Sequence, residues 1–147
     1  MATFISPKIY VTAQIHSVTD LNYENFVKGS NISSEKITRD NCRFITVYVK
    51  IVKPLFFVRN VKIEKVSLNK YLDDTQYFNE IYNKFEFLGS YNSNSKYETS
   101  EGIDVYLDGM TDYKLKDFFN NYKIEVSWIS FLNKQNKKIF YLKDYFE

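Results

Sequence analysis

Residues 43–52 read RFITVYVKIV, and this stretch decides the fold class. Aliphatic side chains occupy every second position, which is the period of a β-strand with one buried face. They are Ile45, Val47, Val49 and Ile51. The alternate positions include Phe44, Tyr48 and Val52, so both faces are largely apolar. We therefore expect a central strand that is covered on two sides.

The same alternation predicts further strands on both sides of this segment. They cover residues 8–16, 57–68, 103–107, 122–132 and 138–146. In residues 57–68 the apolar phase slips, and a bulge or a strand end near Glu64-Lys65 would absorb the slip. The last two strands are joined by the polar residues 133–137, which predicts a β-hairpin. Residues 90–102 are rich in Ser and Asn and predict an exposed loop.

Two segments have helical features. The stronger one follows Thr111, a suitable N-cap, and places four apolar residues on one side of a helix. These are Leu115, Phe118, Phe119 and Tyr122. The weaker one covers residues 71–84, where Asp73 or Asp74 could cap a helix, although residues 85–88 could equally begin a strand.

These elements predict a mainly β chain with an antiparallel β-sandwich of Ig-like architecture and one or two short helices. The alternatives are a partly open barrel and an α+β fold in which one helix packs on an antiparallel sheet. A length of 147 residues without an internal boundary predicts a single globular domain over residues 1–147.

The charge balance limits the kinds of partner that the chain is expected to bind. Lys and Arg number 20, Asp and Glu number 18, and the net charge is +2, which argues against nucleic-acid binding. No apolar run approaches the ~18 residues of a membrane span, and residues 1–8 lack the features of a leader. As written, we expect the chain to be soluble and cytoplasmic, or extracytoplasmic if a leader has been removed.

The residues that usually carry catalysis are scarce. His16 is the only histidine and Cys42 the only cysteine, so a zinc site or a cysteine redox pair lacks its usual residues. The four glycines are isolated, which excludes the glycine-rich loops that hold phosphate groups. We therefore expect no enzyme activity and no cofactor.

Carboxylates between residues 98 and 112 are the exception. Asp104 and Asp108 lie on one face of a predicted strand about 13 Å apart, at ~3.3 Å per residue. That spacing exceeds the separation of about 5–9.5 Å in glycosidase carboxylate pairs. Calcium, which accepts carboxylate oxygens, is the metal these two aspartates could bind. The alternative function is thus a small carboxylate- or calcium-dependent enzyme that uses residues 98–112.

The positions of particular aromatic residues on the predicted strands are the basis for a binding role. Tyr10, Tyr48 and Tyr106 lie opposite the aliphatic side of their strands, where they are either core or an exposed interface. Lys134 and Lys137 cluster at the tip of the last hairpin. The leading expectation is a non-enzymatic interaction module that binds a protein or polysaccharide partner through loops and an aromatic face. The oligomeric state stays open.

Overall fold

A computed structural model of the chain describes most of its predicted strands. The described residues are 6–18, 24, 40, 42–52, 58–68, 70–71, 86–95, 97–106 and 111–147, without the side chains of 86–92 and 106. The strands are β1 (Lys8–Ser17), β2 (Cys42–Val52), β3 (Arg59–Lys65), β4 (Glu86–Asn94), β5 (Glu98–Tyr106), β6 (Lys123–Ile129) and β7 (Gln135–Tyr141). Helix α4 (Asp112–Phe118) and the short 3-10 helix η3 (Leu142–Asp144) are described with both their ends, and Leu68, Lys70 and Tyr71 are also helical. The weaker helix prediction over 71–84 lies almost wholly outside the described residues.

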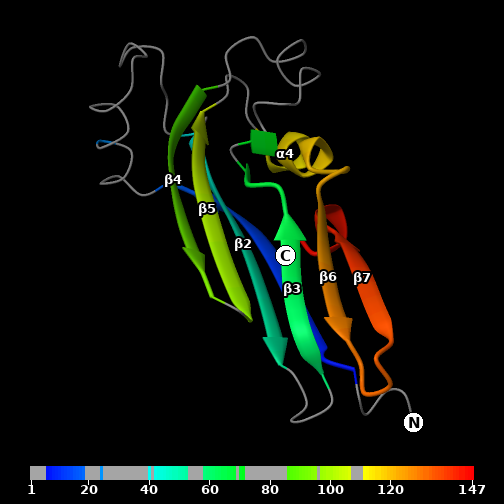
Figure 1. Cartoon of the computed structure of the whole chain (residues 1–147). Helices are drawn as coiled ribbons and strands as arrows, with labels where there is room; N and C mark the ends of the chain where they lie inside the picture. Colours follow the sequence, from blue (N-terminus) through cyan, green and yellow to red (C-terminus); the bar gives the residue numbers. More distant parts are fainter. Residues whose placement is uncertain are drawn as a thin grey trace.

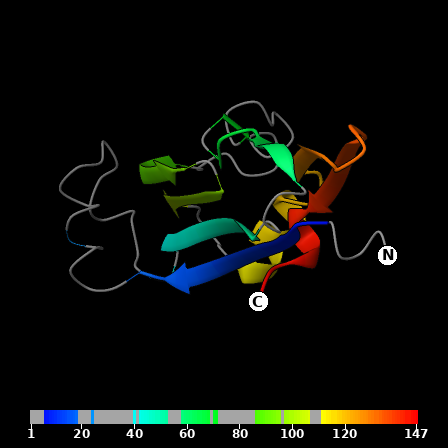
Figure 2. The same cartoon turned by 60° about the horizontal axis from the view of Figure 1, so that its bottom comes forward.

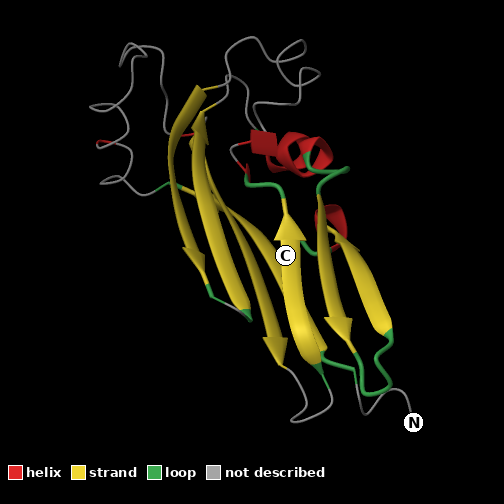
Figure 3. Cartoon of the chain, in the orientation of Figure 1, coloured by secondary structure: helices red, strands yellow, loops and turns green. Residues whose placement is uncertain are grey.

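The strands form two antiparallel sheets (Figures 1 and 3). One sheet has the order β1-β2-β5-β4, and the other has the order β3-β6-β7. Side chains from both sheets join one hydrophobic core. The predicted mainly β, antiparallel architecture is confirmed. The strand order also coincides with that of seven-stranded immunoglobulin constant-type sandwiches, where strands 1, 2, 5 and 4 oppose strands 3, 6 and 7.

The deciding stretch forms β2, which pairs with β1 on one side and β5 on the other. Its four aliphatic residues, Ile45 to Ile51, are at most 4% exposed and point into the core. The central position is therefore as predicted. The expectation of cover on the second face is wrong for the described residues, because Phe44 and Tyr48 remain half-exposed and Lys50 is exposed. That second face belongs to the candidate site below.

The prediction of an exposed loop over residues 90–102 is wrong. Most of this segment pairs as β4 and β5, and between the two strands the Ser95 backbone N–H donates to the Glu98 carbonyl at 2.8 Å. Asn and Gly are depleted in strands, but β5 lies between β2 and β4, so both neighbours bond its backbone. The register shifts between Phe87 and Gly89, a bulge at which the strand accommodates an extra residue. Sequence composition alone did not reveal this pairing.

Helix α4 begins as predicted, with the Thr111 side chain accepting a hydrogen bond from the backbone N–H of Lys114 at 3.2 Å. The helix lies at the end of the two sheets where β3 ends and β6 begins (Figure 1). Its apolar side is buried against Tyr71 and Tyr122, whose ring centroids lie 5.1 Å apart. None of the helices in the described part of the chain has the length and apolar character that crossing a bilayer requires.

The final hairpin differs in detail from its prediction. The turn spans residues 130–134, and β7 ends at Tyr141 instead of continuing to 146. The 3-10 turn of η3 then redirects the chain toward the other sheet. Phe146 forms a parallel bridge with Ala13, and the backbone N–H of Glu147 donates to the Ala13 carbonyl at 3.0 Å. The C-terminal segment thus runs beside the edge strand β1 (Figure 2) and bonds the backbone that this edge exposes.

Candidate functional site

The outer face of the four-stranded sheet carries the aromatic residues that the sequence singled out. We call it the A face, and its members are alternate residues of β1, β2 and β5. They are Tyr10, Thr12, Gln14, His16, Phe44, Thr46, Tyr48, Lys50, Glu98, Ser100, Gly102 and Asp104. The pairing registers align these residues in rows across the sheet. Such cross-strand neighbours lie about 4.5–5.5 Å apart between Cβ atoms, so each row is a continuous strip.

Two predicted binding residues come together on the A face. Tyr10 faces Lys50 and Thr12 faces Tyr48, so the two tyrosines are diagonal neighbours on adjacent strands. Diagonal residues lie about 7–8 Å apart, within reach of aromatic side chains. Tyr10 is 52% exposed. The pair therefore offers ring surface to solvent.

A hydrogen bond fixes the position of the second tyrosine. The Tyr48 hydroxyl donates to the carboxylate of Glu98, which lies on the neighbouring strand β5. This bond raises the pKa of Tyr48 above its ordinary value. The hydrogen bond holds the tyrosine ring across the boundary between β2 and β5.

The only histidine also lies on the A face. His16 Nε2 is 3.3 Å from Thr46 Oγ1, and its ring centroid is 5.9 Å from that of Phe44. Gln14 Nε2 donates to Glu147 Oε2 at 2.9 Å, which ties the chain end to this surface. These neighbours leave His16 half-buried. The face thus combines aromatic rings with hydroxyl, amide and imidazole groups.

Two groups at one end of the A face are shielded from water. Cys42 is fully buried, and burial raises the pKa of its thiol to about 11. Asp104 is half-buried, and burial raises the pKa of its carboxyl to about 6. A protonated thiol is a poor nucleophile, so we interpret Cys42 as a residue that packs in the interior.

Asp104 should make stability depend on pH. Its pKa is about 6 in the folded chain against an ordinary value of 3.8, so the folded state holds the proton more tightly. Stability attributable to this group is present below about pH 4 and falls as the pH rises through 6. Asp104→Asn should therefore stabilise the chain at about pH 7.5 and have a smaller effect at about pH 4.5.

Urea unfolding at the two pH values measures this difference. The exposed Asp144, replaced by Asn, is the matched control and should change little at either pH. An Asp104→Asn effect of equal size at both pH values would show that the carboxyl is not desolvated.

The other predicted site residues lie elsewhere. Tyr106 ends β5 on the A-face side by register, but its side chain is outside the described residues. Lys134 and Lys137 are exposed on the β6–β7 hairpin of the other sheet, so they do not join the tyrosines. Asp108 is outside the described residues, and the proposed calcium pair with Asp104 stays a prediction.

The carboxylates of residues 98–112 do not converge on one point. Glu98 and Asp104 share the A face but are six residues apart along β5, about 20 Å at ~3.3 Å per residue. Glu101 points into the core. Asp112 lies in α4 and accepts a hydrogen bond from Arg43 at 2.9 Å. Within the described ranges, no group of three His, Cys, Asp or Glu side chains is arranged to hold a metal ion.

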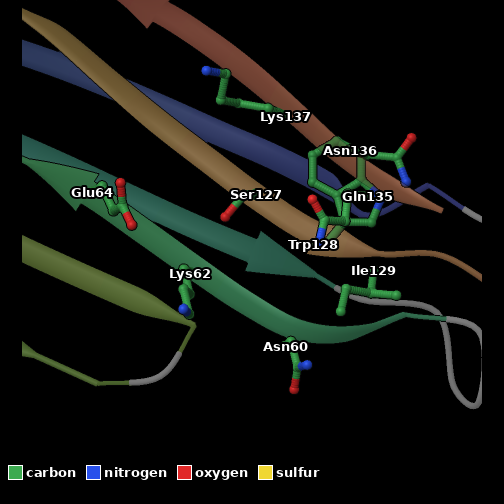
Figure 4. A pocket seen from close by; sticks show the side chains of 9 residues that line it. All are labelled: Asn60, Lys62, Glu64, Ser127, Trp128, Ile129, Gln135, Asn136 and Lys137. Atoms are coloured by element: carbon green, nitrogen blue, oxygen red, sulfur yellow. The ribbon is translucent and has the colours of Figure 1, made fainter. Parts of the chain in front are cut away.

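The three-stranded sheet carries a shallow polar groove on its outer face (Figure 4). Its volume is about 510 Å³, and its lining comes from β3, β6 and β7. Lys62, Ser127 and Lys137 form one row across it, by the pairing of the three strands. The sequence analysis named only Lys137 of these residues. The alternation within the predicted strands was the signal for the other two, because Lys62 and Ser127 alternate with buried Val61 and Val126.

Comparison with known proteins gives no relative: no family model, no curated protein and no solved structure matches this chain.

Proposed function

We propose that the chain is a non-enzymatic binding module that holds a polysaccharide chain on its A face. The observation that carries this proposal is the placement of Tyr10, Tyr48 and Phe44 on one open sheet face. Sugar rings present apolar C–H faces and hydroxyl edges. Aromatic rings complement the former, and neighbouring polar side chains complement the latter. An elongated strip of both kinds suits a chain of sugars.

The polar groups of the A face support a saccharide over a protein partner. Between the rings lie groups that donate and accept hydrogen bonds at the spacing of the strands. They are Thr12, Gln14, Thr46, Lys50, Glu98 and Ser100. The core of a protein interface is depleted in charged residues, whereas here Lys50 lies between Tyr10 on one side and Glu98 on the other. Gly102 leaves β5 without a side chain in the middle of the strip.

The state of the reactive side chains supports a binding role. The Cys42 thiol is buried and protonated, and His16 lies against Thr46 and Phe44. The carboxylates of β5 are divided between two faces of the sheet. A protein of this design would recognise its ligand and leave it chemically unchanged.

Removing the rings tests the proposal. Tyr10→Ala and Tyr48→Ala should each weaken binding by at least about tenfold, because a buried aromatic anchor contributes more than about 1.4 kcal/mol. The assay is native affinity electrophoresis in gels that contain soluble xylan, mixed-linkage glucan, mannan or starch. Tyr141→Ala is the matched control, since Tyr141 is 45% exposed on the outer face of the other sheet.

Two results would contradict the proposal. One is a wild-type chain that none of the four polysaccharides retards. The other is retardation that the A-face variants share with the wild type and with Tyr141→Ala.

A further inference from the structure

The tip of the β6–β7 hairpin exposes two adjacent apolar side chains. Phe131 is 64% exposed and Leu132 is 82% exposed. Leu132 is the most exposed large apolar residue in the described part of the chain. A single exposed leucine is ordinary on a soluble protein, but two adjacent large apolar residues on a projecting turn invite a partner.

The turn that carries these residues is well bonded. The Ser130 backbone N–H donates to the Lys134 carbonyl at 2.9 Å, and that of Asn133 donates to the Ser130 carbonyl at 3.0 Å. Asn133 adopts a φ of 59°, a left-handed conformation that asparagine tolerates. The Arg59 guanidinium donates to the Asn133 side chain and so joins the turn to β3. The apolar pair is therefore presented by a defined backbone.

Positive charge surrounds the tip. Five exposed basic residues lie on the hairpin and on the adjoining start of β3: Arg59, Lys62, Lys134, Lys137 and Lys138. The described acids nearest to them on these strands are Glu64 and Glu125, which face each other one row farther from the tip. Glu125 already lies 3.6 Å from Lys123 and 3.9 Å from Lys137. The end of the sheet therefore presents the apolar residues Phe131 and Leu132 next to these five basic residues, which we call the basic collar.

We propose that this hairpin end docks on an anionic phospholipid bilayer. Phe131 and Leu132 enter the boundary between headgroups and acyl chains, and the basic collar faces the lipid phosphates. Apolar burial and attraction to anionic lipids add in such interfacial binding. An acidic polysaccharide would satisfy the collar but would leave the apolar tip without a partner, so the lipid surface fits both features.

The dimensions agree with this arrangement. The row formed by Lys62, Ser127 and Lys137 is two residues from the end of β6, about 7 Å at ~3.3 Å per residue. The headgroup layer of one leaflet is about 5–7 Å thick. The turn of residues 130–134 extends beyond the end of β6, so when the tip reaches the acyl boundary Lys134 lies within the headgroup layer and the row faces that layer from the aqueous side. Figure 1 shows that β6 points its C-terminal end toward this tip.

Insertion can be measured with a label on the tip itself. Cys42 is fully buried, so a Leu132→Cys variant offers one accessible thiol for a polarity-sensitive fluorophore. We expect a blue shift and brighter emission on mixing with vesicles of phosphatidylcholine and phosphatidylserine. Pure phosphatidylcholine vesicles should give little change, and added salt should weaken the response. An unchanged spectrum with the anionic vesicles would overturn the proposal.

Variants with native thiols give a second measurement. In vesicle sedimentation, Phe131→Ser with Leu132→Ser should weaken binding by about 30-fold or more, since both substitutions remove apolar surface that the bilayer would partly bury. Tyr113→Ser, which changes a ring that is 79% exposed on α4, is the matched control. Lys134→Glu with Lys137→Glu should weaken binding by more than about tenfold. The corresponding control is the exposed Lys70, replaced by Glu.

The alternatives give different results. Binding to heparin that survives the serine variants, without vesicle binding, would overturn the proposal in favour of an acidic polysaccharide. A blue shift that rises with protein concentration in the absence of vesicles would overturn it in favour of self-association. Tyr10→Ala and Tyr48→Ala should leave vesicle binding unchanged, so this proposal and the polysaccharide proposal fail or succeed separately.

Discussion

Replacing Lys65 with Met is expected to lower the free energy of unfolding by about 3–5 kcal/mol, because it strands a charged carboxylate in the core. Lys65 Nζ forms an ion pair with Glu101 Oε2, and the two side chains are only 10% and 4% exposed. Glu101 Oε1 also accepts the backbone N–H of Leu68 at 2.6 Å. Lys65 lies on β3 and Glu101 on β5, so this pair links the two sheets through the interior.

A double variant separates the charge from the packing. Glu101→Gln keeps an oxygen that can accept the Leu68 N–H but carries no charge. Lys65→Met combined with Glu101→Gln should therefore recover most of the loss in urea unfolding. Lys62→Met, at an exposed position of the same strand, should change stability by less than about 0.5 kcal/mol. If Lys65→Met were as mild as Lys62→Met, the pair would not be buried as described.

The second large effect is expected at the helix end of the core. Phe119 is fully buried, and its ring lies among several others. Its centroid is 5.4 Å from that of Tyr71, 5.1 Å from Phe118, 6.0 Å from Tyr122 and 6.1 Å from Phe146. Phe119→Ala removes these contacts and leaves a cavity, at a cost of about 3–5 kcal/mol.

The same cluster joins distant parts of the chain, which is why the loss should be cooperative. Tyr71 donates its hydroxyl proton to the Phe118 carbonyl at 2.8 Å. Calorimetry or urea unfolding of Phe119→Ala measures the cost. Tyr113→Ala changes an exposed ring on the same helix and should stay within about 0.5 kcal/mol of the wild type. A Phe119→Ala loss below about 1 kcal/mol would mean that the helix does not close this end of the core.

The strands that bury one apolar face could be predicted from the sequence. The aliphatic alternation of β2 and the apolar side of α4 each set a period that only one kind of element satisfies. The predicted strand over residues 122–132 likewise buries its alternate apolar residues Ile124, Val126 and Trp128, the last of which is 9% exposed. These segments can be predicted locally, because the spacing of the buried apolar residues is visible within a few consecutive residues.

The segments whose structure was predicted wrongly depend on partners that are distant in the sequence. Residues 98–102 form a strand because β5 lies between two others, and buried Glu101 is tolerated because Lys65 meets it from the opposite sheet. The bridge of Phe146 to Ala13 likewise joins the two ends of the described chain. No local pattern encodes such pairings. The tyrosines of the A face were visible as alternate positions, but their polar neighbours on β5 were hidden in the supposed loop.

The binding role of the A face is tested most directly by tyrosine footprinting. The chain is nitrated with and without the polysaccharide that retards it, and each tyrosine is read by mass spectrometry. Our account predicts that bound polysaccharide protects Tyr10, which is 52% exposed, while Tyr141, which is 45% exposed, reacts as before. Protection of Tyr141 with Tyr10 still reactive would place the ligand on the other sheet and contradict the account.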